Sequence, residues 1–160
     1  MRLPEWLRRR LHERIERIAS KRAPDFVIGG PEDPYLKRWW VIPRNRFFNV
    51  YLHHFLRSDD DRALHDHPWW NASILIVGGY VEHTINAGGV NVRTEYSAGA
   101  VKLRGARAAH RIELDRGPCW TIFITGPRLR EWGFHCPHGW RPWQQFVSSK
   151  DAGEVGRGCD

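Results

Sequence analysis

Three histidines have the residue type and the spacing that could hold a metal ion. His65 and His67 stand two positions apart in the run HDHPWW, and His110 follows later in the chain. Residues at i and i+2 of an extended strand point to the same face, so these two side chains would project together. A third imidazole from a facing strand would complete a site with open positions for substrate, water or dioxygen. The alternative is that the HDH run is a polar turn and His110 lies on an exposed strand.

The charge of such a site indicates the kind of substrate it would take. Three neutral ligands leave the full charge of a divalent ion in place, which favours an anionic small molecule that chelates it. Arginines near the candidate strands could bind a carboxylate or phosphate through paired hydrogen bonds, namely Arg57, Arg104 and Arg107. A solvated surface position is the alternative for each. Trp69, two residues after His67, could wall an apolar pocket.

Glu82 is the carboxylate best placed to join the histidines, as a fourth ligand or as a general base. It lies two residues after Tyr80 in the run YVEHTI, on the same face of an expected strand. A solvent-facing strand glutamate is the alternative. Of the adjacent histidines His53 and His54, one must face inward, where it could orient a ligand, bind substrate or be a satisfied core residue.

Asp66 stands between the two ligand histidines and therefore faces away from the metal. Together with Asp59, Asp60 and Asp61, it is more typical of a turn or of a hydrogen-bond partner behind the ligands. We therefore do not expect these carboxylates to bind the ion.

The segments that must position these residues are short and strand-like. Strands are expected at 26–28, 38–42, 47–57, 72–77, 80–85, 92–96, 100–103, 110–114 and 120–125. Glycine, proline and asparagine between them mark turns. Many short antiparallel strands at this spacing predict a sandwich or a barrel.

The N-terminal segment has a different pattern. Apolar residues recur there at steps of three and four, which predicts an amphipathic helix over 4–20. Residues 1–22 contain eight Arg or Lys against three Glu, so most of the net charge of +7 belongs to this segment. We expect the helix to pack on the barrel or against a dimer partner, with a nucleic-acid or membrane-surface contact of its basic face as alternatives. The expected divisions are a helix at 1–23, a barrel at 24–147 and a frayed polar tail at 148–160.

Composition limits the location of the protein. A chain of 160 residues suits one domain, and neither an apolar run long enough for a membrane span nor a signal-peptide pattern is present. We therefore expect a cytoplasmic protein. Its cysteines, Cys119, Cys136 and Cys159, are odd in number and do not have the spacing of a disulfide framework, which predicts reduced thiols.

Residues 40–126 resemble the cupin superfamily. Its two motifs run G-x5-H-x-H-x3-4-E-x6-G and G-x5-P-x-G-x2-H-x3-N, and the second is matched only loosely. The matching positions are His65, His67, Gly78 or Gly79, Gly99, Gly105 and His110. This resemblance implies an all-β, double-stranded β-helix (cupin or jelly-roll) barrel with a metal at its centre, here preceded by the amphipathic helix.

The departures from the motifs narrow the implied chemistry. Asn71 or Ala72 stands where many cupins have a glutamate ligand, which leaves a three-histidine site similar to that of thiol dioxygenases and gentisate-type enzymes. The Ser-x-His-x-Tyr relay of thiol dioxygenases is missing around Phe123, Thr125 and Pro127, so we do not expect a cysteine dioxygenase. The resemblance implies a non-haem Fe(II) oxygenase acting on a small anionic or aromatic metabolite, with zinc, nickel, copper or manganese as other ions.

Three alternatives to an oxygenase remain open. A non-catalytic cupin would bind a small ligand and use its basic helix to contact nucleic acid or a partner protein. A zinc or nickel enzyme would use the same three histidines to polarise a carbonyl. A metal-free cupin isomerase would use a histidine and a tyrosine, Tyr80 or Tyr96, as acid and base. Analogy with other cupins adds a homodimer as a further expectation.

Overall fold

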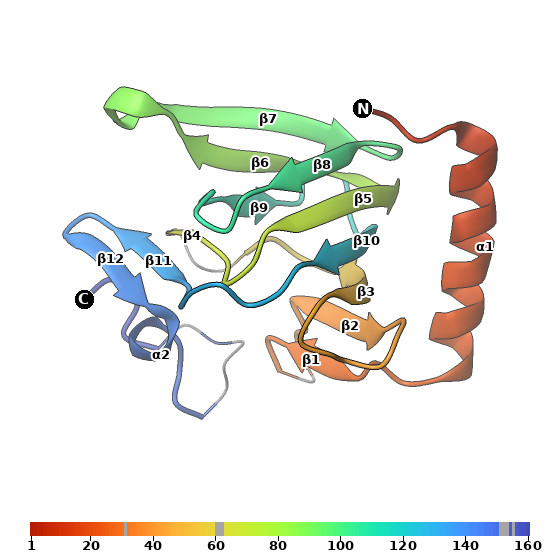
Figure 1. The fold of residues 1–160 in the computed structure, drawn as a ribbon, viewed down its shortest axis with the longest axis horizontal. Helices are drawn as coiled ribbons and strands as arrows, with labels where there is room; N and C mark the ends of the chain where they lie inside the picture. The colour runs from red at the N-terminus through yellow and green to blue at the C-terminus, as the bar shows by residue number, and fades with distance from the viewer. Residues whose placement is uncertain (31, 60–62, 151–153, 155) are drawn as a thin grey trace.

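The architecture is a two-layered β-structure with one long helix at its side (Figure 1). The computed structural model describes residues 1–30, 32–59, 63–150, 154 and 156–160. The elements in chain order are α1 (Glu5–Lys21), β1 (Phe26–Ile28), β2 (Leu36–Trp40), β3 (Asn49–Phe55), β4 (Leu64–His65), β5 (Asn71–Val77), β6 (Gly79–Ile85), a 3-10 turn (Ala87–Gly89), β7 (Asn91–Ser97), β8 (Val101–Arg104), β9 (Arg111–Glu113), β10 (Cys119–Thr125), β11 (Gly133–Cys136), β12 (Gly139–Pro142) and α2 (Trp143–Phe146).

One layer is a six-stranded antiparallel sheet in the order β1-β2-β3-β10-β5-β8. The other consists of two three-stranded sheets, β7-β6-β9 and β12-β11-β4. These two meet at an isolated bridge between His65 and His110, whose backbone groups exchange two hydrogen bonds of 2.9 Å. Two candidate metal ligands therefore lie at the seam that makes the second layer continuous.

The six-stranded sheet buries both of its faces. In β10, the buried residues alternate with partly buried ones, as expected for a strand whose neighbouring side chains point to opposite faces. One face contributes Leu36, Phe55 and Leu75 to a core inside the barrel. The opposite face contributes Trp39, Leu52 and Ile76 to a second core that includes Ile15 of α1.

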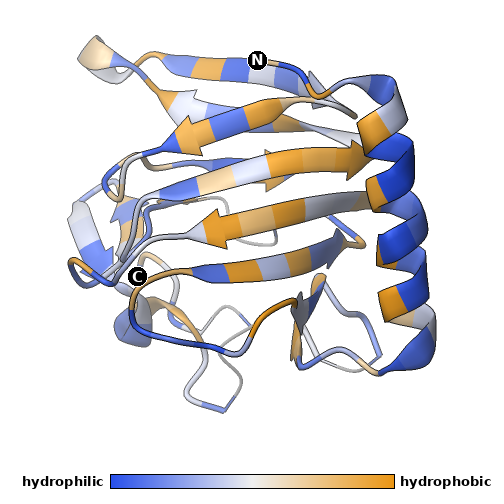
Figure 2. Cartoon of the chain, turned by 45° about the vertical axis from the view of Figure 1, so that its right-hand side comes forward, coloured by the Kyte–Doolittle hydropathy of each residue, from blue (hydrophilic) through white to orange (hydrophobic). Residues whose placement is uncertain are grey.

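Helix α1 forms because its apolar residues share one side. It runs across the strands of the six-stranded sheet, and its outer side is largely hydrophilic (Figure 2). Ile15 is buried, and Leu11 and Ile18 are half-buried against the sheet. The expected packing of the helix on the barrel is thus what this chain shows. No helix among the described residues is long and apolar enough to cross a bilayer.

Each expected strand segment overlaps an observed strand, but β4, β11, β12 and α2 were not anticipated. The strand β4 has only two residues, and the β11-β12 hairpin contains Gly133, Pro137 and Gly139, which are typical of loops. Strong alternation of apolar residues is what made the other strands recognisable.

The C-terminal segment corrects two expectations. Cys136 and Cys159 form a disulfide, so the prediction of reduced thiols is wrong for these two residues, while Cys119 is free and buried. The amides of Gly156 and Gly158 both donate to the carbonyl of Phe146, at 2.9 and 3.1 Å. The described part of the tail is therefore bound back to β11 and α2 rather than frayed.

Candidate metal centre

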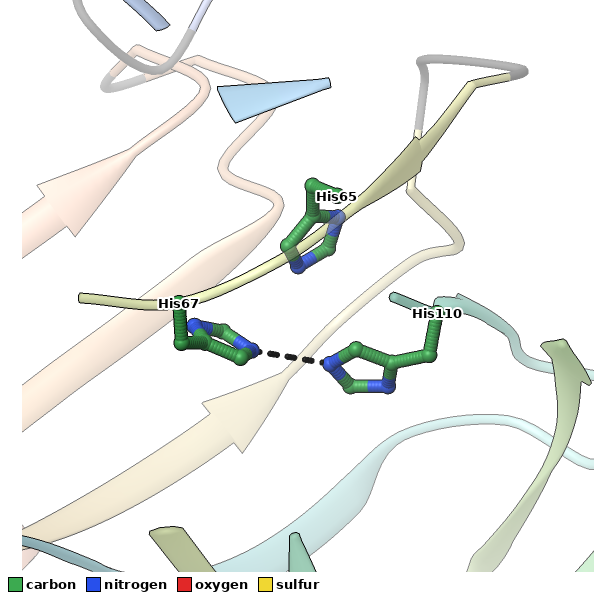
Figure 3. A group of neighbouring side chains, drawn as sticks. All are labelled: His65, His67 and His110. Atoms are coloured by element: carbon green, nitrogen blue, oxygen red, sulfur yellow. Dashed lines mark hydrogen bonds between the residues drawn. The ribbon is translucent and has the colours of Figure 1, made fainter. Parts of the chain in front are cut away.

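The three histidines converge as their spacing predicted (Figure 3). His65 ends β4, His67 follows it in an extended segment, and His110 directly precedes β9. Each offers one ring nitrogen to a group in which the nitrogens lie within 4.8 Å of one another. The ring centroids form a nearly equilateral triangle with sides of 5.0 to 5.2 Å. Such a cluster can bind a single ion through one face and leave the opposite side open.

Backbone hydrogen bonds fix the positions from which these rings project. His65 and His110 are held together by the strand bridge, and the amide of His67 donates to the carbonyl of Ala106 at 3.0 Å. The Nε2 atoms of His67 and His110 lie 2.9 Å apart. Main-chain hydrogen bonds thus align the ligands that come from two segments. These bonds do not depend on the histidine side chains.

The three rings are electrically suited to bind a cation. Burial holds the pKa of His67 and His110 well below the ordinary histidine value and also lowers that of His65. Neighbouring positive groups, including Arg104, add to the effect. Neutral imidazole is the form that has a free lone pair for a metal.

Glu82 lies behind His110, where it fixes the orientation of the ring. The carboxylate is buried, and its Oε1 accepts hydrogen bonds from His110 Nδ1 at 2.7 Å and from Lys102 Nζ at 2.8 Å. Arg104 donates to its Oε2. Because Nδ1 donates to a carboxylate, Nε2 is left with the lone pair that faces the other histidines. Glu82 is therefore neither the solvent-facing residue nor a member of the group that could hold the ion.

Tyr80 and Lys102 extend this buried polar group. Lys102 Nζ donates to the Tyr80 hydroxyl at 2.7 Å and lies 4.5 Å from the centre of the Tyr80 ring. Burial, together with the nearby Arg104, lowers the pKa of Lys102 to about 7. Burial also raises the pKa of Tyr80, so its hydroxyl stays protonated at neutral pH.

Asp66 has the role of a supporting residue that its position predicted. Its carboxylate accepts hydrogen bonds from the amide of Gly133 at 2.9 Å and from the indole of Trp140 at 3.0 Å. Arg130 pairs with it at 2.6 Å. The segment that bears His65 and His67 is thereby tied to β11 and β12. Asp59 accepts from the amide of Ile112, whereas Asp60 and Asp61 lie outside the described residues.

The histidines face a cavity of about 510 Å³ between the two layers. Aromatic and aliphatic side chains make up most of its lining, and Trp69 stacks on His67 with ring centroids 5.1 Å apart. Tyr80 and Arg104 also line it, as does the inward-facing histidine, His53. The cavity has the apolar walls and few polar groups typical of a small-molecule site.

Two of the arginines expected to bind substrate do not line the cavity. Arg57 pairs with the carboxylate of Asp33 at 3.0 Å and with the Asp33 carbonyl, and Arg107 is exposed. Arg104 does line the cavity, although it also pairs with Glu82. Sequence reasoning missed Arg38, which lies on β2 and faces the cavity. The expected strand began at Arg38 and so left out Leu36, whose place two residues earlier on the same face was the signal that could have found Arg38.

Comparison with known proteins defines the fold. No family model and no curated protein matches the chain. A solved structure, an uncharacterised conserved protein from Klebsiella pneumoniae with a double-stranded β-helix domain, is 18% identical with a TM-score of 0.50, covering 66% of this chain and 88% of the other.

Two further solved structures have the same fold, with a similarly low sequence identity to this chain. The oxalate decarboxylase of Bacillus subtilis, with Mn(II) centres, is 16% identical with a TM-score of 0.51, covering 69% of this chain and only 30% of its own. An iron(II) HppE bound to substrate is 12% identical with a TM-score of 0.50, and the match covers 64% of this chain and 56% of the HppE chain. The chain therefore has a double-stranded β-helix fold, as the resemblance of its histidine motifs implied.

Proposed function

We propose that this protein is a metal-dependent cupin enzyme in which His65, His67 and His110 hold a divalent ion, with Fe(II) as the first candidate. It would oxygenate a small anionic or aromatic metabolite. The observation that carries the proposal is the convergence of three neutral imidazoles on one cavity, with Glu82 behind them orienting His110.

The donor set supports a transition metal of intermediate softness. Three imidazole nitrogens suit iron, nickel, copper or zinc, and the fold also occurs in proteins described with iron(II) and Mn(II). A bound iron(II), held by the three histidines, would supply the redox chemistry that an oxygenase needs. Zinc would instead favour a hydrolase or isomerase at the same ligands.

The chain's own residues would bind and enclose the substrate. Trp69 and the other apolar walls exclude water from the reacting groups. The hydrogen bond from His110 to Glu82 fixes the ring and strengthens its Nε2 as a donor to the metal. Because the pKa of Tyr80 is raised, its hydroxyl can hold or donate a proton at the cavity but does not act as a base at neutral pH.

Metal analysis of protein purified without added metal tests the proposal, with His110→Ala as the variant and His138→Ala as the control. His138 is exposed and lies outside the cluster. We expect about one iron per chain in the wild type and in His138→Ala, and none in His110→Ala, because two imidazoles alone hold a divalent ion weakly. Stoichiometric metal in His110→Ala would contradict the site, and zinc in place of iron would contradict the oxygenase.

A further inference from the structure

Arg38 is a cation inside the cavity that has no acidic partner among the described residues. It projects from β2, on the sheet that faces the histidine-bearing layer, and it lines the cavity. Its guanidinium donates from Nε to His53 Nε2 at 2.8 Å and lies 5.1 Å from the Tyr51 ring centroid. Burial lowers the pKa of Arg38 to about 10, so it still bears its charge at neutral pH. Arg38 is half-buried, and a charge withdrawn from water is costly unless something pairs with it.

His53, the residue that contacts Arg38, has an unmet donor of its own. Since its Nε2 accepts from Arg38, the proton of the neutral ring resides on Nδ1. Burial holds the pKa of His53 well below the ordinary value, which keeps this neutral form. His53 is only 3% exposed, and its Nδ1 is buried without a hydrogen-bond partner in the described part of the chain. Buried donors in folded proteins are nearly always satisfied, so this one indicates a missing acceptor.

Two described acidic residues line the cavity, and they are engaged elsewhere or exposed. Asp59 accepts from the amide of Ile112, and Glu154 lies exposed at the C-terminal segment. Glu82, which stands behind His110 and is not part of the lining, already accepts from Lys102 and pairs with Arg104. Arg44, exposed at another part of the lining, adds a further positive charge. The cavity is therefore positive on the Arg38 side as well as at the proposed ion.

We propose that Arg38, oriented by His53, is an anion subsite that binds a carboxylate of the substrate. This deepens the proposed function and rests on it, because it gives the substrate a second point of attachment on the sheet opposite the histidines. A guanidinium offers two parallel N–H donors, which match the two oxygens of a carboxylate. The aromatic lining then surrounds the body of the molecule, so the substrate class is an aryl or similarly apolar carboxylic acid.

Calorimetric titration of the protein as purified tests the subsite with benzoate and its neutral isostere benzamide. The wild type should bind benzoate at least about tenfold more tightly than benzamide, because only the carboxylate can pair with Arg38. Arg38→Gln should lose this preference. Arg38→Lys keeps the charge but not the paired donors. The affinity for benzoate should therefore fall by at least about threefold, while the affinity for benzamide is unchanged. If Arg38→Gln does not fold, Arg38→Lys carries the test.

Arg14→Gln is the matched control, since Arg14 is an exposed arginine on α1 and the change in charge is the same. Its preference for benzoate should equal that of the wild type. Retention of the preference in Arg38→Gln, or equal binding of benzoate and benzamide by the wild type, would overturn the subsite. Tighter binding of phenylphosphonate than of benzoate would overturn the choice of a carboxylate.

The outcome is separable from that of the metal proposal. His110→Ala should keep the preference for benzoate although it loses the ion, because Arg38 lies on the other sheet. A preference lost in His110→Ala and kept in Arg38→Gln would place the carboxylate at the histidines and overturn the subsite. A wild type that holds no metal and still prefers benzoate would overturn the proposed function and leave the subsite supported.

Discussion

At the scale of single residues, two buried carboxylates support the histidines from behind. Glu82 accepts from His110, and Asp66 ties the segment of His65 and His67 to the neighbouring hairpin. Each of the two segments that bring ligands thus has its own acidic partner. A carboxylate that accepts from a ligand histidine, as Glu82 does from His110, strengthens the donor atom of that ligand without occupying a coordination position.

Replacing Glu82 by Gln should separate this supporting role from that of a ligand. The side-chain carbonyl of glutamine can still accept from His110 Nδ1 but has no negative charge, so the ring becomes a weaker donor and the affinity for the metal should fall about 10- to 100-fold, as for other partners of ligand histidines. Lys102 and Arg104 would also lose their buried partner, which should cost about 3 to 5 kcal/mol in the free energy of unfolding. Chelator competition and urea unfolding measure the two effects.

The matched control is Glu95→Gln, because the side chain of Glu95 is 72% exposed and pairs with the exposed Arg116. We expect its free energy of unfolding to change by no more than about 0.5 kcal/mol and its metal affinity to stay the same. Metal affinity equal to that of the wild type in Glu82→Gln would show that the charge of Glu82 does not strengthen His110 as a ligand.

At the scale of the elements, α1 stabilises the sheet that forms one wall of the cavity. The outer face of this sheet is apolar, and the helix supplies Ile15 to the core formed there by Trp39, Leu52 and Ile76. The opposite face of the same strands presents His53 and Phe123 to the cavity. Packing on one face therefore helps to fix side chains on the other.

Ile15→Ala should destabilise the protein without changing the histidine site. Ile15 is 4% exposed, and truncation of a buried isoleucine costs about 2 to 5 kcal/mol. Ile85→Ala, at a position 56% exposed, removes the same atoms and should change the unfolding free energy by no more than about 0.5 kcal/mol. Urea unfolding of both variants checks this. Equal stability of the two would mean that α1 contributes little to the fold.

Local pattern decided which elements could be predicted. The strand β5 contains the apolar run ILIV, and α1 has apolar residues at helical spacing, so each was expected within a few residues. The strand β4 is too short to have a pattern, although it bears His65. Its pairing is set by the backbone bridge to His110, a contact between segments far apart in the sequence.

The same distinction applies to the site. His65, His67 and His110 were recognisable because two of them form a local motif and the third follows glycine-rich turns. The contact of Glu82 with His110 depends on the register of β6 against β9, where Glu82 faces Ile112. Arg38 meets His53 through the register of β2 against β3. Registers of this kind arise from the packing of the whole sheet, and spacing along one strand does not determine them.

At the scale of the whole molecule, the C-terminal segment helps to close the cavity. Val147 and Glu154 line the cavity, although they follow the last strand. Arg141 donates to the carbonyl of Gly158 at 2.9 Å, and the disulfide joins Cys159 to β11. The tail is thus an integral part of the wall. No periodic pattern marks it in the sequence, because its contacts are single hydrogen bonds and one covalent link.

Cys159→Ser should loosen this wall and lower the stability of the protein. The disulfide closes a loop with a sequence separation of 23, for which the entropy of the unfolded chain predicts a loss of about 3 kcal/mol in the free energy of unfolding. Urea unfolding without reductant measures the difference from the wild type. Reductant should lower the free energy of unfolding of the wild type to that of the variant and leave the variant unchanged, since only the wild type has the bond to lose.

Thiol titration of the unfolded chains should give one thiol for the wild type and two for the variant. Three thiols in the unfolded wild type, with equal stability of both proteins, would instead support reduced cysteines and a tail held by hydrogen bonds alone.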